Sequence, residues 1–118
     1  MKFSLVTLYM EELEPSLAFY RDLLGMQELR RIDTPGGAIV FLGQGGNVEL
    51  ELIAGKQYAG SRYTGFSIGF DVDDMEAAIA KLEEQGIKKV SGPANAGGTT
   101  ILAFFEGPSG EQVELIQH

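Results

Sequence analysis

The sequence predicts an α+β fold in which two tandem β-α-β-β-β units form a cupped mixed sheet with helices on its outer face. The first observation behind this prediction is that the tetrapeptide LELI at 50–53 returns as VELI at 113–116. The second is that MEEL at 10–13 corresponds to VDDM at 72–75, each before an amphipathic segment. A nearly constant offset of 62 or 63 positions indicates two copies of one supersecondary unit.

The length of the chain limits how these copies are organised. A chain of 118 residues is long enough for one domain but too short for two independent cores. We therefore expect a single domain over 1–118, with repeat units of approximately 1–55 and 64–118. The units share their hydrophobic interior or complete it with a second chain.

The first unit is expected to begin with a strand over 3–10, whose side chains alternate between two faces. Pro15 suits a first helical turn, and apolar residues then recur at helical spacing until Gly25, where a C-terminal cap is expected. Gly-rich turns then separate short stretches of strand-forming residues. Three strands are expected from these stretches, at 27–33, 38–42 and 47–53.

A linker is expected at 56–64, after which the second unit repeats the order of the first. It begins with a strand at 66–72, and Asp73 or Asp74 can cap the helix that follows. The Gly-rich segment 92–98 is expected to be a connecting loop. The three remaining strands are expected at 88–91, 99–105 and 111–117. The helical positions expected to be buried are Leu13, Leu17, Tyr20, Met75, Ile79 and Leu82.

Composition excludes several classes of partner. A net charge of −8 argues against nucleic acid and anionic membranes, which require basic surfaces. It is compatible with a cationic ligand, although acidity commonly serves solubility alone. The sequence has no apolar run of about 20 residues and no signal-peptide pattern, so we expect a cytoplasmic protein. The absence of cysteine excludes disulfides and thiolate metal sites.

Each unit ends in a strand that carries a carboxylate between apolar neighbours. Glu51 lies between two leucines, and Glu114 lies between a valine and a leucine. A carboxylate facing the helix would be buried without a partner, which costs several kcal/mol. The apolar rows therefore pack on the helices, and both glutamates are expected on the concave face. By the same offset, Leu5 of the first strand corresponds to Ser67, and both point into the cup.

Three segments resemble the vicinal oxygen chelate superfamily, the group of glyoxalase I, bleomycin-resistance proteins and extradiol dioxygenases. They are ELEPSLAFYRDLLGM at 12–26, VDDMEAA at 72–78 and FEGPSGEQVELI at 105–116. The resemblance covers nearly the whole chain. It is fairly specific for the fold and is not specific for one activity.

In metal-dependent members similar to glyoxalase I, two histidines and two glutamates hold a divalent cation. The resemblance places the glutamates on Glu51 and Glu114 and the histidine positions on Leu5 and Ser67. Two carboxylates alone make a poor site for Zn²⁺ or Ni²⁺, whereas a hard cation can use carboxylates together with water. We therefore expect no cofactor and no tightly bound metal; the alternative is a divalent metal held weakly by Glu51 and Glu114.

Further residues are expected to line the ligand cavity. Tyr58, Arg62 and Tyr63 lie in the linker, where they form either a lid over the cavity or an exposed connection. Aromatic residues of the seventh strand alternate between faces, which favours Phe104 for the cup, although core packing is the commoner role of such residues. The complete expected ligand-binding set is Leu5, Thr7, Ser67, Tyr58, Arg62, Tyr63 and Phe104.

Three functions compete at this point. The first is a module that binds a small organic molecule, neutral or cationic, similar to bleomycin-resistance proteins. The second is a lyase or isomerase similar to glyoxalase I, with Glu51 and Glu114 as its catalytic acid–base pair. The third is a structural or accessory domain in which both glutamates are satisfied by water or polar neighbours. A homodimer is expected, because unpaired sheet edges and apolar surface such as Phe3 and Leu5 need covering.

Overall fold

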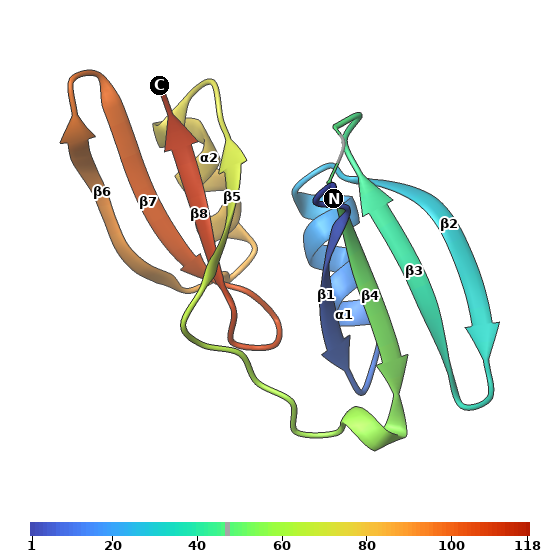
Figure 1. The fold of residues 1–118 in the computed structure, drawn as a ribbon. Coiled ribbons are helices and arrows are strands. Elements are labelled where there is room, and N and C mark those ends of the chain that lie inside the picture. Colours follow the sequence, from blue (N-terminus) through green and yellow to red (C-terminus); the bar gives the residue numbers. More distant parts are fainter. Residues whose placement is uncertain (47) are drawn as a thin grey trace. The chain divides into compact units, whose positions relative to one another are not determined.

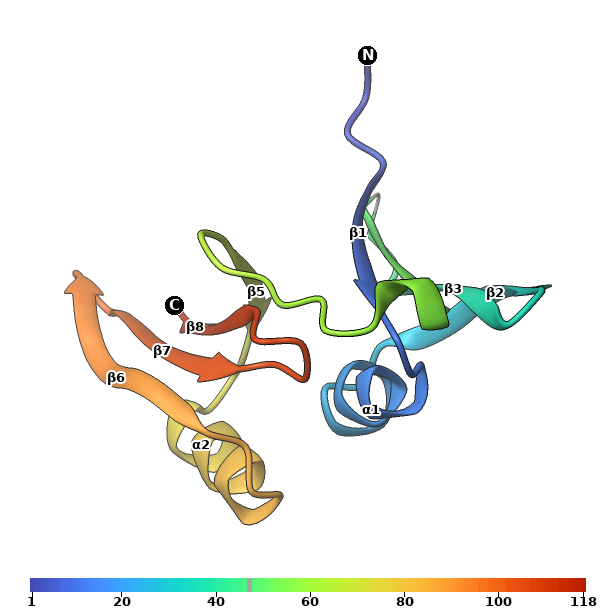
Figure 2. The same ribbon diagram turned by 90° about the horizontal axis from the view of Figure 1, so that it is seen from below.

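The computed structural model describes residues 1–46 and 48–118 and divides into two compact units, Met1–Ser61 and Arg62–His118. Each unit contains one four-stranded mixed sheet with its helical segment on one face (Figure 1). The view in Figure 2 shows each helix beneath the sheet of its own unit. The α+β class and the β-α-β-β-β order of both units are confirmed.

The first unit is ordered β1-β4-β3-β2, with β1 parallel to β4 and the other pairs antiparallel. Position 47, the first residue of the strand expected at 47–53, lies outside the described residues. The elements are β1 (Leu5–Met10), α1 (Glu14–Ser16), η1 (Leu17–Leu23), β2 (Gln27–Thr34), β3 (Gly37–Gly43), β4 (Glu49–Gly55) and the 3-10 turn η2 (Lys56–Tyr58).

The helical segment of the first unit differs from the expected α-helix because η1 is a π-helix. The amide of Leu24 donates to the carbonyl of Phe19 over 2.9 Å, five residues back along the chain. Phe19 and Tyr20 are both buried, and their rings meet edge to face at a centroid distance of 4.9 Å. The helical spacing of the sequence predicted burial of Leu13, Leu17 and Tyr20 correctly and missed Phe19.

The second unit has the equivalent order β5-β8-β7-β6, with β5 parallel to β8. The side chain of Asp74 accepts a hydrogen bond from the amide of Ala77 and caps the second helix, one of the two caps that the sequence offered. The elements are β5 (Ser67–Asp71), α2 (Met75–Glu84), β6 (Lys89–Gly97), β7 (Thr100–Glu106) and β8 (Gln112–Gln117).

The expected loop at 92–98 is wrong for most of its length, because residues up to Gly97 belong to β6. This strand lies at the edge of the sheet and pairs with β7 through several register shifts, one of them between Ser91 and Ala94. An edge strand with bulges accommodates Pro93, which has no backbone N–H to donate a hydrogen bond. A side chain at Gly92 would place its Cβ 2.6 Å from the carbonyl oxygen of Leu102, so close pairing here depends on glycine.

Alternation in the strands separates a core face from an open face in each sheet. We use "open face" for the sheet face opposite the helix of the same unit.

Of the predicted helical core positions in the second unit, Met75 and Leu82 are buried, whereas Ile79 is only half-buried beside a hollow that Pro93 and Ile101 also line. The strand residues buried beneath the helices include Leu8, Met10, Val40, Leu42, Leu50, Leu52, Ala103, Phe105, Val113 and Leu115.

The turn before β8 is built around a buried carboxylate. Glu111 is fully buried, and its Oε1 accepts a hydrogen bond of 2.7 Å from the amide of Ser109. A Cβ on Gly107 would lie 2.6 Å from this carboxylate, so a larger residue would require the Glu111 side chain to move. The turn thereby sets the start of the strand that carries Glu114. Among the described residues, no helix is long and apolar enough to cross a membrane.

Candidate functional site

The open face of the first unit presents one row of functional side chains across all four strands. Strand register aligns Thr7 of β1, Glu51 of β4, Phe41 of β3 and Arg30 of β2. Directly paired residues project from the same face of a sheet. The row therefore combines a hydroxyl, a carboxylate, an aromatic ring and a guanidinium group.

Glu51 is held by a neighbouring hydroxyl. Oγ1 of Thr7 donates a hydrogen bond of 2.6 Å to Oε1 of Glu51, and both side chains are half-buried. An ionised carboxylate can accept about four hydrogen bonds, so this contact orients Glu51 and leaves it capacity for a ligand. Thr7 and Glu51 were both expected to line the site, and the structure brings them together.

Arg30 was missed by the sequence reasoning. Its guanidinium forms an ion pair with Glu49 and lies 4.4 Å from the centre of the Phe41 ring, which is the geometry of a cation–π contact. A bulge between Glu28 and Arg30 shifts the pairing of β2 with β3. Simple alternation along β2 therefore could not assign Arg30 to the open face.

Apolar residues border this row on the open face. Leu5 lies opposite Glu49 and is 38% exposed, as expected for a position on the open face. On the other side of the row, Tyr9 pairs with Ile53, and its ring lies 4.9 Å from that of Tyr58. Tyr58 therefore packs beside the open face of the first unit.

The open face of the second unit repeats the central pair of the row. Glu114 lies opposite Phe104 of β7, just as Glu51 lies opposite Phe41. Its parallel neighbour is Gly69, which has no hydroxyl. Oγ of Ser67, two residues earlier on β5, lies 3.5 Å from Oε1 of Glu114. Glu114 is therefore held less closely than Glu51.

A second polar row on this face lines a pocket of about 520 Å³. The residues of the row are Ser67, Gln112, Glu106 and Lys88, one from or beside each strand. Phe66 and Val90 add apolar surface to the lining. All of the lining residues belong to the second unit.

The linker residues that were expected to form a lid are divided between the two units. The unit boundary falls after Ser61, so Tyr58 stays with the first unit. In the second unit, Nη2 of Arg62 lies 3.2 Å from Oε1 of Glu106, at the polar pocket. The amide of Tyr63 donates to the carbonyl of Ser109 over 3.0 Å, and its ring lies 6.4 Å from that of Phe66.

Comparison with known proteins identifies the family. A family model described as the Glyoxalase/Bleomycin resistance protein/Dioxygenase superfamily matches residues 2–115. The chain belongs to this superfamily. The expected resemblance is thereby confirmed at the level of the family.

Relatives similar to this chain include proteins named lactoylglutathione lyase and a solved structure of a glyoxalase I. The chain is 38% identical over 114 residues to a probable lactoylglutathione lyase of Synechocystis, covering 90% of this chain and 87% of that protein. It is also 38% identical to a lactoylglutathione lyase of Neisseria meningitidis, covering 89% and 82%. A solved structure of a trypanothione-dependent glyoxalase I from Leishmania major superposes with a TM-score of 0.80 at 25% identity, covering 99% of this chain and 86% of that one.

The metal that the superfamily implies does not fit the donors on the open faces. One carboxylate on each open face contacts a hydroxyl, Glu51 with Thr7 and Glu114 with Ser67. The further carboxylates Glu49 and Glu106 form ion pairs with arginines. Within the part of the chain that the structure describes, no three His, Cys, Asp or Glu side chains gather as a possible metal site. A tight Zn²⁺ or Ni²⁺ site normally has three or four nitrogen, sulfur or carboxylate donors. We therefore derive no chemical step through a metal.

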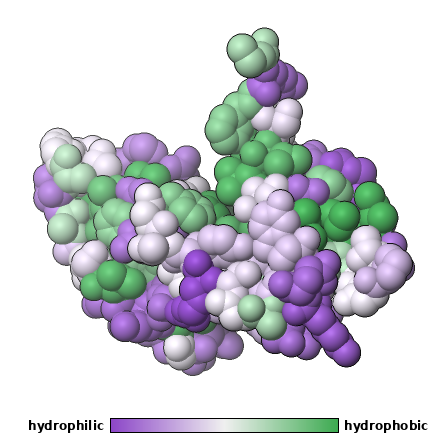
Figure 3. All heavy atoms as spheres, turned by 60° about the horizontal axis from the view of Figure 1, so that its bottom comes forward, coloured by the Kyte–Doolittle hydropathy of each residue, from purple (hydrophilic) through white to green (hydrophobic). Residues whose placement is uncertain are grey.

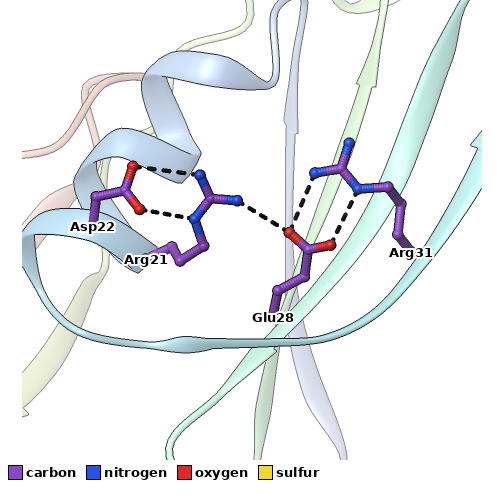
Figure 4. Close-up of polar contacts among 4 residues, drawn as sticks. All are labelled: Arg21, Asp22, Glu28 and Arg31. Carbon is purple, nitrogen blue, oxygen red and sulfur yellow. Dashed lines mark hydrogen bonds and ion pairs between the residues drawn. The ribbon is translucent and has the colours of Figure 1, made fainter.

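A charged network outside the open face joins η1 to β2 (Figure 4). The guanidinium of Arg21 binds Asp22 over 2.8 Å and Glu28 over 3.2 Å, and Arg31 binds Glu28 over 3.2 Å. Hydrogen bonds from Arg31 and then Arg21 lower the pKa of Glu28 below its ordinary value. The hydrogen bond from Arg21 likewise lowers the pKa of Asp22. This network is exposed and links the end of η1 to the start of β2.

Proposed function

We propose that this glyoxalase-superfamily protein binds a small organic ligand against its open sheet faces without a tightly held metal. The observation that carries the proposal is the repeated pair of a carboxylate and an aromatic ring, Glu51 beside Phe41 and Glu114 beside Phe104. An aromatic surface provides contact area for an apolar group, and a neighbouring carboxylate accepts hydrogen bonds from a polar one.

The charge of the first open face favours a cationic group on the ligand. Glu49 is paired with Arg30, whereas Glu51 is satisfied by an uncharged hydroxyl. One negative charge on this face is therefore not balanced by the ion pairs described there. A ligand ammonium group next to Glu51 gains from the charge of this carboxylate.

We also propose an assembly in which Glu51 and Glu114 face the same ligand. The alternatives are a single domain within one chain and a homodimer that exchanges units. The dimer is supported by apolar surface near the N-terminus, where Phe3 is 66% and Leu5 is 38% exposed. Figure 3 shows apolar side chains below the projecting N-terminal segment. We propose that the protein acts on small molecules in the cytoplasm. Its acidic composition argues against nucleic acid and anionic membranes as partners.

A lactoylglutathione lyase or related isomerase activity is the second candidate. It is favoured by the curated relatives with that name at 38% identity. In this case Glu51 and Glu114 are the catalytic acid and base, with or without a weakly bound divalent metal. Turnover of lactoylglutathione by the purified protein, followed through its thioester absorbance, separates this activity from binding alone.

The binding proposal is tested by NMR titration with benzyltrimethylammonium, an aromatic cation, and with benzyl alcohol as its neutral counterpart. We expect saturable shifts at the amides of Thr7, Phe41 and Glu51 with the cation, and affinity about fivefold weaker in Glu51→Gln. The matched control is Glu84→Gln on α2, which should bind like the parent protein. Equal affinity for the cation and the alcohol, or an equal loss in both variants, would contradict the proposal.

A further inference from the structure

We propose that the polar pocket of the second unit is a subsite for an oxyanion, with Lys88 as the residue that selects the charge. This inference rests on the proposed function, because it assigns the pocket to one end of the same ligand. The group that it binds is a carboxylate or a phosphate. Lys88 acts as a specificity-determining residue, and the side-chain amide of Gln112 is a hydrogen-bond donor beside it.

The register of the sheet brings these side chains together from residues far apart in the sequence. Ser67 pairs with Gln112, and Gln112 pairs with Glu106. The amide of Glu106 then donates to the carbonyl of Lys88 over 2.9 Å, which extends the row beyond the start of β6. All four residues line the pocket of about 520 Å³, which has ample room for a carboxylate or phosphate group.

The charges around the pocket favour an anion. Glu106 is neutralised by Arg62 at 3.2 Å. Lys88 takes part in none of the ion pairs formed by the described residues. Arg62, Lys88 and Glu106 together therefore carry one net positive charge, in a chain whose net charge is −8. Glu114 of the next row does not line the pocket, so Lys88 and Glu106 are its charged lining residues. Hydrogen bonds from an ammonium group to an oxyanion are stronger than those between neutral groups.

The neighbouring row indicates what the rest of the ligand carries. Ser67 reaches from this pocket to Glu114, which lies in the next row of the same face. Glu114 is on β8 and Lys88 is beside β6, two strands away, so roughly 10 Å separates the strands that carry them. Phe104 of β7 lies between them. The arrangement suits a zwitterionic ligand with a donor group at Glu114, an apolar middle on Phe104 and an anionic end at Lys88.

Lys89 provides a matched control. It pairs with Phe105, which is fully buried on the face that packs against the helix. Paired residues share a face, so Lys89 projects away from the open face that carries the pocket. Lys88 and Lys89 thus have the same charge and adjacent positions, and only Lys88 lines the pocket.

The experiment is a pair of NMR titrations at constant ionic strength, one with inorganic phosphate and one with acetate. The shifts in each are compared with those in sodium chloride at the same ionic strength. We expect at least one of the two to give saturable shifts at the amides of Ser67, Lys88, Glu106 and Gln112. The anion that binds more tightly identifies the group as phosphate or carboxylate. Lys88→Gln should weaken this binding about fivefold or more, and Lys89→Gln should leave it unchanged. No saturable shift, or an equal loss in both variants, overturns the subsite.

The same samples separate this inference from the proposed function. Lys88→Gln should still bind benzyltrimethylammonium with the affinity of the parent protein, which also shows that the variant is folded. Binding of the cation without binding of either anion overturns the subsite alone. Binding of an anion at Lys88 without binding of the cation at Glu51 overturns the cationic part of the proposed function and leaves the subsite in place.

Discussion

Thr7 lies directly opposite Glu51 in the parallel pair of β1 and β4, and its hydroxyl donates a hydrogen bond of 2.6 Å to Oε1 of Glu51. The same position in the second unit is Gly69, so Glu114 relies on the more distant Ser67 at 3.5 Å. The two repeats therefore retain the carboxylate and differ in what holds it. The carboxylate of the first unit accepts a short hydrogen bond, and the carboxylate of the second unit accepts a longer one.

Replacing Thr7 by valine tests this contact. Thr7→Val keeps the shape of the side chain and removes the donor to the half-buried Glu51. We expect the free energy of unfolding, measured with urea at pH 7, to fall by about 1 kcal/mol. Thr34→Val is the control, because no side-chain hydrogen bond of Thr34 is found among the described residues. An equal loss in both variants would show that the hydroxyl of Thr7 contributes nothing specific.

Metal binding provides a second prediction. We expect elemental analysis of the parent protein to show far less than one equivalent of zinc, nickel or iron. Leu5→His together with Ser67→His adds two imidazoles on the open faces, one of them next to Glu114. The affinity for Ni²⁺ should then rise about tenfold or more.

The control for the metal experiment is Ser91→His, which adds an imidazole opposite Phe104 instead of next to a carboxylate. It should leave the affinity for Ni²⁺ close to that of the parent protein. An unchanged affinity in the double variant would contradict the assignment of the family's two histidine positions to Leu5 and Ser67. One equivalent of metal in the parent protein would contradict the prediction of a metal-free site.

The charged network of Figure 4 predicts a pH dependence of stability. The pKa of Glu28 is lower in the folded protein than its ordinary value of 4.5, because Arg31 and Arg21 hydrogen-bond to its charged form. The stabilisation is therefore complete above about pH 4.5 and is lost as the pH falls through the lower, folded-state pKa.

The variant that tests this dependence is Glu28→Gln. Thermal unfolding at pH 7 should show a Tm about 2 °C lower than that of the parent protein, as expected for an exposed pair. The difference should shrink as the pH is lowered below 4.5. Glu84→Gln, at an exposed position without an ion pair among the described residues, should show neither effect. A Tm difference for Glu28→Gln that persists unchanged at low pH would exclude the ion pairs as its cause.

The proposed dimer leads to a prediction about size. Sedimentation at micromolar concentration should give a species of twice the chain mass of 12.8 kDa. Phe3→Ser with Leu5→Ser reduces the exposed apolar surface near the N-terminus and should shift the distribution toward the monomer. A single species near 12.8 kDa for the parent protein would show that the dimer is wrong.

Much of the architecture could be predicted because the decisive patterns are local. Alternation around Glu51 and Glu114 assigned both to the face opposite the helix, since period-two side-chain direction is set within a strand. The register of the parallel strands could not be predicted in this way. The pairing of Thr7 with Glu51, and the offset of Ser67 from Glu114, depend on how β1 and β5 slide along their partners.

The sequence by itself determined the tandem repeat, the family and the face that carries the two carboxylates. Only the tertiary structure decided the π-helical winding of η1, the extension of β6 to Gly97 and the contact of Arg30 with Phe41. It also decided the polar row that ends at Lys88. The physical reason is that periodicity is set by neighbouring residues, whereas bulges, register and packing are set by strands that meet only after the chain has folded.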